Sequence, residues 1–155
     1  MKTIQWRLVI LLSMFGFVMS IATVFWIPSQ TEPLFWLGIF VVCALIIASQ
    51  AKSKFFLHGF LTSIFNCIWI TGAHVLFQAQ YLANHQNEAM MMKNTPLAGS
   101  PILAMLIIGP IIGVVSGLIL GLFSFAATYV VKRKKIECCE TKEQTPSLDA
   151  DRFHS

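Results

Sequence analysis

Charged side chains are scarce in this chain, and its middle part has almost none. Asp, Glu, Lys and Arg together make up 12% of the 155 residues, against about 25% in an average soluble domain. Only five of them lie between Arg7 and Lys132, namely Glu32, Lys52, Lys54, Glu88 and Lys93. This distribution argues against a soluble domain, because it leaves uncharged stretches that are long enough to cross a bilayer.

The sequence also lacks the residue patterns that carry most enzyme chemistry. It has no phosphate-binding loop, no metalloprotease helix motif and no serine paired with a histidine at a recognisable spacing. Its four cysteines, Cys43, Cys67, Cys138 and Cys139, form no C-x-x-C pair, which argues against a thiol oxidoreductase. We therefore favour a protein that is not an enzyme and that uses no cofactor and no metal.

What the sequence does contain is four long apolar segments. They cover residues 8–27, 34–50, 55–81 and 102–131, and a membrane-spanning helix takes about 20 such residues. The segments lack the alternation of apolar and polar residues that is typical of β-strands. Strands in lipid would also have to form a closed barrel. The prediction is an all-α integral membrane protein with four transmembrane helices in a bundle within residues 1–135. A polar, disordered cytoplasmic tail is expected at 136–155.

The charges beside the spans predict how the bundle is oriented. Lysine and arginine lie at 2–7, 52–54 and 131–135, whereas the links at 28–33 and 82–100 carry almost none. These residues accumulate on the cytoplasmic side of membranes, so both termini are expected to be cytoplasmic. Because the positive charge is concentrated at span ends, it indicates a lipid bilayer as the partner and no nucleic acid.

The first apolar segment admits a second interpretation. Residues 1–22 have a basic start, an apolar middle and the small-x-small site Ser20-Ile21-Ala22, as a secretory signal peptide does. The apolar run continues through 23–27, beyond that site, which favours an uncleaved span. Cleavage would leave three spans with the same orientation.

The fourth span carries small residues along one helical face. They are Gly109, Gly113, Gly117, Gly121, Ser124 and Thr128. In water each glycine costs about 1 kcal/mol relative to alanine, but in lipid small residues let two helix backbones approach closely. The pattern therefore predicts a helix-packing groove. Three partners remain open: another span of this chain, a second copy of the chain in a homo-oligomer, or the interior of a pore.

The third span carries polar side chains along one face. They are Ser63, Asn66, Cys67, Thr71, His74 and Gln78. Polar side chains of a transmembrane helix usually point into the bundle and hydrogen-bond to neighbouring helices. The alternative is a hydrated path or a small-ligand site centred on Asn66 and Cys67. His74 is the best titrating candidate of the set.

The second outer link contains side chains of types that bind metals. They are His85, Glu88, Met90, Met91 and Met92, and thioethers favour Cu(I). Methionine at a membrane surface is also ordinary apolar material, and the spacing specifies no coordination geometry. We therefore assign no metal site here.

Two functions remain after these exclusions. The first is a scaffold or accessory subunit that acts through helix–helix packing with a membrane-protein partner. The second is a small channel or carrier for a neutral or weakly charged solute, since no span contains the charged residue that ion-coupled carriers need. The hydropathy profile is similar to that of small four-span bacterial inner-membrane proteins, which implies that location. The first span lacks the glutamate of small multidrug carriers, so we assign no family.

Reporter fusions test the predicted orientation. Fusions after Lys135 and in the link at 52–54 should report the cytoplasm, because basic flanks stay inside, and a fusion at Asn87 should report the outside. The measurement compares a reporter that is active only outside with one that is active only inside. An outside signal from the Lys135 fusion would overturn the orientation.

Overall fold

The computed structural model describes residues 3–94 and 99–143 of the chain. Its helices are α1 (Trp6–Phe25), α2 (Glu32–Gln50), α3 (Phe55–Leu76), α4 (Gln78–Asn84), α5 (Gln86–Lys93) and α6 (Pro101–Glu143). Four of them, α1, α2, α3 and the 101–133 part of α6, are long and apolar enough to cross a membrane. The described residues contain no strand. The predicted all-α fold with four transmembrane helices is confirmed.

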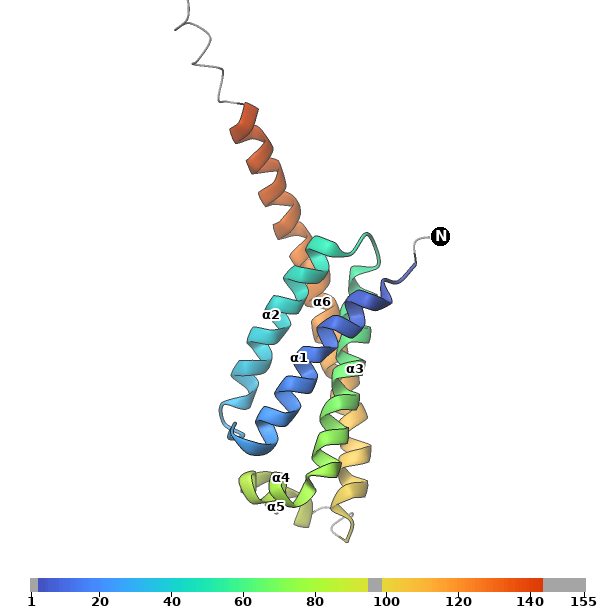
Figure 1. The fold of residues 1–155 in the computed structure, drawn as a ribbon, viewed down its shortest axis with the longest axis vertical. Helices are drawn as coiled ribbons and strands as arrows, with labels where there is room; N and C mark the ends of the chain where they lie inside the picture. Colours follow the sequence, from blue (N-terminus) through green and yellow to red (C-terminus); the bar gives the residue numbers. More distant parts are fainter. Residues whose placement is uncertain (1–2, 95–98, 144–155) are drawn as a thin grey trace, which may run out of the picture.

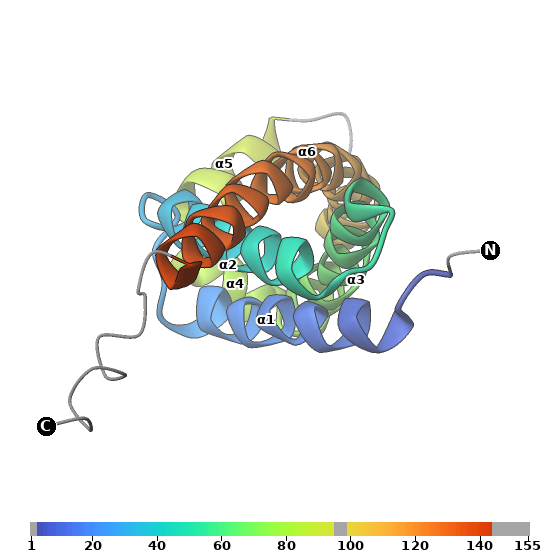
Figure 2. The ribbon, with the colours of Figure 1, turned by 90° about the horizontal axis from the view of Figure 1, so that it is seen from above.

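The four long helices run side by side, and successive ones point in opposite directions (Figure 1). The start of α1, the α2–α3 link and the far end of α6 lie at one end of the bundle, where α6 extends beyond the other helices. The α1–α2 link lies at the opposite end, together with α4 and α5, and we call this the capped end. Seen from above, α3 lies beside α6 and α1 (Figure 2). Helix α2 packs mainly on α6 and touches α1 little.

Local chemistry explains the first helix boundaries. Helix α1 ends at Phe25, shortly before Pro28, and a residue preceding proline disfavours the helical conformation. Pro33 lies in the first turn of α2, where its missing N–H is not needed. Lys54 adopts a left-handed conformation with φ of 54°, which turns the chain from α2 into α3. Its carbonyl accepts the backbone N–H of His58 at 3.1 Å.

The third span is shorter than the sequence predicts. We expected it to reach residue 81, but α3 ends at Leu76 and Phe77 leaves the helical conformation with φ of −110° and ψ of 32°. The chain then turns into α4, which lies across the capped end (Figure 1). This turn buries Tyr81 and lets the Asn84 side chain donate to the Val24 carbonyl at 2.7 Å. The turn therefore replaces a protruding helix end with contacts to α1.

The fourth helix is longer than the sequence predicts. We expected disorder from residue 136, whereas the backbone of α6 is helical to Glu143; the rest of the expected tail lies outside the described residues. A helix that has already formed adds each further residue without a new nucleation step. The segment at 136–143 also contains three glutamates and a lysine, which are good helix formers.

Apolar side chains form the core at both ends of the bundle, and polar or small ones form its middle. One cluster joins α1, α2 and α6 and includes Leu12, Ile47 and Leu120. A smaller cluster at the capped end contains Val24, Tyr81 and Met105. Between them, the contact of α1 with α3 contains buried serine, threonine and asparagine side chains. Close packing and hydrogen bonds hold helices together in lipid, where burial of apolar surface contributes little.

Two glycines on α3 provide a matched test of this packing. A Cβ atom on Gly59 would lie 2.5 Å from the Ser124 Oγ and 2.7 Å from the Leu120 carbonyl oxygen, whereas a Cβ on Gly72 would meet nothing within 4 Å. Gly59→Ala should therefore destabilise the bundle by about 1–3 kcal/mol, as overpacking does. Gly72→Ala should leave the stability unchanged or slightly higher. The measurement is the temperature at which detergent-solubilised protein loses its monodisperse state; equal shifts for the two variants would contradict the close contact.

Candidate functional site

The small-residue face of α6 lies against α3. A Cβ built on Gly109 would contact Thr71, and one on Gly113 would lie 2.6 Å from the Cys67 Cβ. Farther along, the glycine partners come from two stacked rings of α3: Phe60 meets Gly117, and Phe56 meets Gly121. Ser124 and Thr128 extend this face and are buried, and Ser124 lies against Gly59. All four glycines of the predicted groove therefore contact a span of the same chain.

Hydrogen bonds cross this α3–α6 contact where the glycines leave backbone carbonyls accessible. The Ser63 Oγ donates to the Gly113 carbonyl at 3.4 Å, and the Cys67 Sγ donates to the Gly109 carbonyl at 3.1 Å. Ser124 donates to the Leu120 carbonyl of its own helix at 2.7 Å. The Ser63 and Cys67 side chains therefore contribute hydrogen bonds to the contact between α3 and α6.

Other members of the predicted polar stripe face α1. Asn66 lies against Gly16, whose Cβ would meet the Asn66 side chain. His74 lies 3.5 Å from the Thr23 hydroxyl. Gln78 belongs to α4, beyond the break at Phe77, so its position on a continuous helical wheel no longer applies. The structure therefore divides the stripe between two helix contacts and one separate helix.

The sequence reasoning missed the matching face of α1. Its small and polar residues Ser13, Gly16, Ser20 and Thr23 lie three or four positions apart and are all buried. Ser13 accepts the Trp69 indole N–H at 3.4 Å, and the Trp69 ring packs edge-on against Phe17. The spacing was visible in the sequence, since it is the period of one helical face. This face of α1 contains one glycine, whereas the small-residue face of α6 contains four, so its pattern is the weaker of the two.

Asn66 and Thr62 stand out within the α1–α3 contact. Both are almost fully buried, at 2% and 0% exposure. Within the described part of the chain, neither the Asn66 amide nor the Thr62 hydroxyl has a hydrogen-bond partner. A buried polar group without a partner costs roughly 1–3 kcal/mol. A water molecule or a small polar solute at this pair would therefore gain hydrogen bonds.

Three aromatic rings stack at the capped end. The Tyr81 ring lies between His74 and His85, with ring centroids 4.0 and 4.3 Å apart and interplanar angles of 23° and 19°. His74 comes from α3, Tyr81 from α4, and His85 from the turn between α4 and α5. Burial, together with the carboxylates of Glu32 and Glu88, raises the pKa of Tyr81 above its usual range. The phenol therefore stays neutral throughout the physiological pH range.

Two carboxylates lie beside this stack and link it to α2 and the α1–α2 link. The Glu32 Oε2 lies 4.0 Å from the His85 Nε2, and the Glu32 Oε1 accepts the Trp36 indole N–H at 3.2 Å. Glu88 accepts the Ser29 hydroxyl at 2.9 Å. The sequence did not reveal that Glu32 lies near His85, because the two residues are 53 positions apart. Glu32 was considered only as a charged residue in the link between the first two spans.

The metal-ligand types of the second outer link do not gather around one point. His85 is directed to Glu32, Glu88 bonds to Ser29, and Met90 and Met91 are exposed; the Met92 side chain lies outside the described residues. Among the side chains that the structure describes, at residues 3–91, 93–94 and 99–133, no group of three or more His, Cys, Asp and Glu would suit a metal ion.

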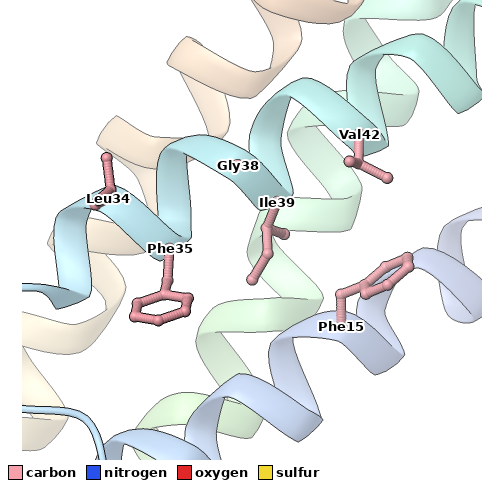
Figure 3. A pocket seen from close by; sticks show the side chains of 6 residues that line it. All are labelled: Phe15, Leu34, Phe35, Gly38, Ile39 and Val42. Atoms are coloured by element: carbon pink, nitrogen blue, oxygen red, sulfur yellow. The ribbon is translucent and has the colours of Figure 1, made fainter.

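An apolar groove separates α1 from α2. It has a volume of about 330 Å³ and is lined by Phe15, Leu34, Phe35, Gly38, Ile39 and Val42. Figure 3 shows Phe15 of α1 and Phe35 and Ile39 of α2 pointing into the space between the two helices. A Cβ on Gly38 would meet nothing within 4 Å. The groove is therefore a place where the bundle leaves a glycine-containing helix face without a neighbour.

Comparison of this chain with protein-family models, with curated proteins and with solved structures produced no match.

Proposed function

We propose that this protein is a non-enzymatic membrane subunit, a scaffold or accessory protein that binds a transmembrane helix of another membrane protein. The observation that carries the proposal is the unfilled groove between α1 and α2. The bundle lies in a bilayer with both termini cytoplasmic, as the basic flanks favour, and the membrane is the bacterial inner membrane.

The interior of the bundle supports a structural role for most of its polar groups. Ser63 and Cys67 bond to carbonyls of α6, and Trp69 bonds to Ser13 of α1. The α6 glycines are covered by α3 side chains. These groups are therefore engaged in holding the helices together, which leaves the outer surface as the place where a partner binds.

The groove has the features that a partner helix needs. Helices α1 and α2 are joined by a short link, yet they make few contacts with each other. Their facing sides are therefore accessible to another helix. Gly38 has open space beside it, and small residues are where transmembrane helices approach closely. Phe15 and Phe35 border that space with large apolar rings (Figure 3), which provide packing area on both sides of the glycine.

Photo-cross-linking tests the helix-binding groove. A photoreactive amino acid at Val42, inside the groove, should give a discrete protein adduct in native membranes, because a partner helix lies within reach. The same amino acid at Val41, an exposed neighbour that does not line the groove, is the matched control. Gly38→Phe should abolish the adduct and leave the bundle folded, since the side chain would begin in open space, where a Cβ meets nothing within 4 Å. Lipid adducts alone at both positions would refute the proposal.

A second function, a channel or carrier for neutral solutes, is favoured by one observation. Asn66 and Thr62 are buried between α1 and α3 without hydrogen-bond partners in the described structure. A hydrated path through the bundle would satisfy them, since buried polar groups are usually bonded to protein or to ordered water.

Solute flux separates the two functions. Liposomes that contain the protein should release glycerol no faster than empty liposomes, because the α3 polar groups are divided between two closed helix contacts. The measurement is light scattering after an osmotic shift. Release above the empty control that disappears in Asn66→Leu would favour the channel over the scaffold.

A further inference from the structure

The end of the bundle opposite α4 and α5, which we call the open end, carries positive charge on two segments that are distant in sequence (Figure 1). Lys52 and Lys54 lie in the link between α2 and α3, Lys132 lies near the end of the apolar part of α6, and all three are exposed. The only carboxylates among the side chains that the structure describes, those of Glu32 and Glu88, lie at the capped end. No described carboxylate therefore neutralises these lysines.

The packing of α3 on α6 brings the two segments to nearly the same depth. Gly59 lies against Ser124, and the two helices run in opposite directions (Figure 1). Lys54 is five residues from Gly59 and Lys132 is eight from Ser124, so they lie about 7 and 12 Å beyond this contact, toward the same end. The difference of about 5 Å fits within one headgroup layer of a bilayer.

The apolar core fixes the backbone beside each lysine. Ala51 belongs to the cluster that joins α1, α2 and α6, and Phe55 and Val131 pack against the same cluster. Each of these three residues is the direct neighbour of one of the lysines in the sequence. The lysine backbones are therefore held close to the bundle, while their flexible stems let the ammonium groups extend to the membrane surface.

The backbone at Lys54 is held independently of its side chain. Its φ of 54° lies in the left-handed region, which glycine and asparagine adopt more readily than lysine. The Lys54 carbonyl accepts the His58 backbone N–H at 3.1 Å and the His58 Nδ1–H at 2.9 Å. The Nε2 of the same ring accepts the Gln5 backbone N–H at 3.0 Å. These bonds fix the turn, so the lysine side chain is available to a ligand.

Exposed aromatic rings lie next to the lysines on the side of the spans. Tyr129 precedes Lys132 by three positions, which places both on one face of α6, and it is 65% exposed. Phe56 follows Lys54 by two positions and is 37% exposed. Amphipathic rings such as tyrosine are typical of headgroup depth. A soluble anion would use the positive charge alone, whereas a phospholipid presents a phosphate directly above hydrocarbon and matches both features.

We propose that the open end binds an anionic phospholipid, whose phosphate lies between the α2–α3 link and α6 and accepts hydrogen bonds from Lys52, Lys54 and Lys132. Basic clusters directly beside transmembrane helices attract anionic lipids in this way. A zwitterionic lipid carries its own ammonium group, so it gains less from the lysines. The bound headgroup connects α6 to the link and leaves the groove between α1 and α2 untouched, so this site does not depend on the proposed function.

Lipid titration of the full chain in an uncharged detergent tests the site. The probes are dioleoyl phosphatidylglycerol and dioleoyl phosphatidylcholine, which share their acyl chains, and the measurements are native mass spectrometry and the melting temperature. Phosphatidylglycerol should bind as one tight lipid per chain and raise the melting temperature, and phosphatidylcholine should bind more weakly. Lys52→Gln and Lys132→Gln should each weaken that same binding step about fivefold, which corresponds to about 1 kcal/mol per lysine.

Lys93→Gln is the matched control, because it removes the same charge from an exposed residue at the capped end, and it should bind phosphatidylglycerol as the wild type does. All three variants should melt as the wild type does without added lipid, since their side chains are exposed. Equal binding of both lipids or equal weakening by Lys93→Gln and Lys132→Gln would overturn the proposal. So would two tight lipids of which each variant loses a different one, or displacement of the lipid by millimolar inorganic phosphate.

Discussion

The close approach of α3 to two other helices is the contact on which the rest of this bundle depends. On one side its side chains cover the glycines of α6, and its own Gly59 lies against the Leu120 carbonyl. On the other side Asn66 fills the space that Gly16 of α1 leaves. Helices in lipid gain little from burying apolar surface, so contacts this close provide the dispersion energy that holds them together.

This packing explains how the polar residues of the spans are used. A glycine leaves the carbonyl of its helix accessible, and Ser63 and Cys67 reach two such carbonyls on α6. The polar side chains therefore add interhelical hydrogen bonds to a contact that the glycines make possible. Helix α2 lies outside this arrangement, packs on α6, and leaves a groove toward α1, which is why we place partner binding there.

The capped end is held together by other kinds of contact than the membrane-spanning helices. It is held by stacked rings, by the Asn84 bond to the Val24 carbonyl and by carboxylates near the α1–α2 link. These contacts join α1, α3, α4 and α5 to the start of α2. The bundle thus combines a middle made of tight, uncharged contacts with an end held by ring stacking and by hydrogen bonds to polar side chains.

The sequence by itself determined the number of spans, because a run of about 20 apolar residues is a local property and is sufficient for a helix to cross the bilayer. It also showed that α6 presents a small-residue face, since that face follows from the spacing of Gly109 to Gly121 on any helix. Only the tertiary structure decided which helix packs against this face and which neighbours the polar side chains of α3 contact. Which helix covers the glycines depends on how the spans cross, and the stripe of α3 divides because its two sides meet different neighbours. The pairing of His85 with Glu32 required the break at Phe77, which depends on contacts between segments far apart in the chain.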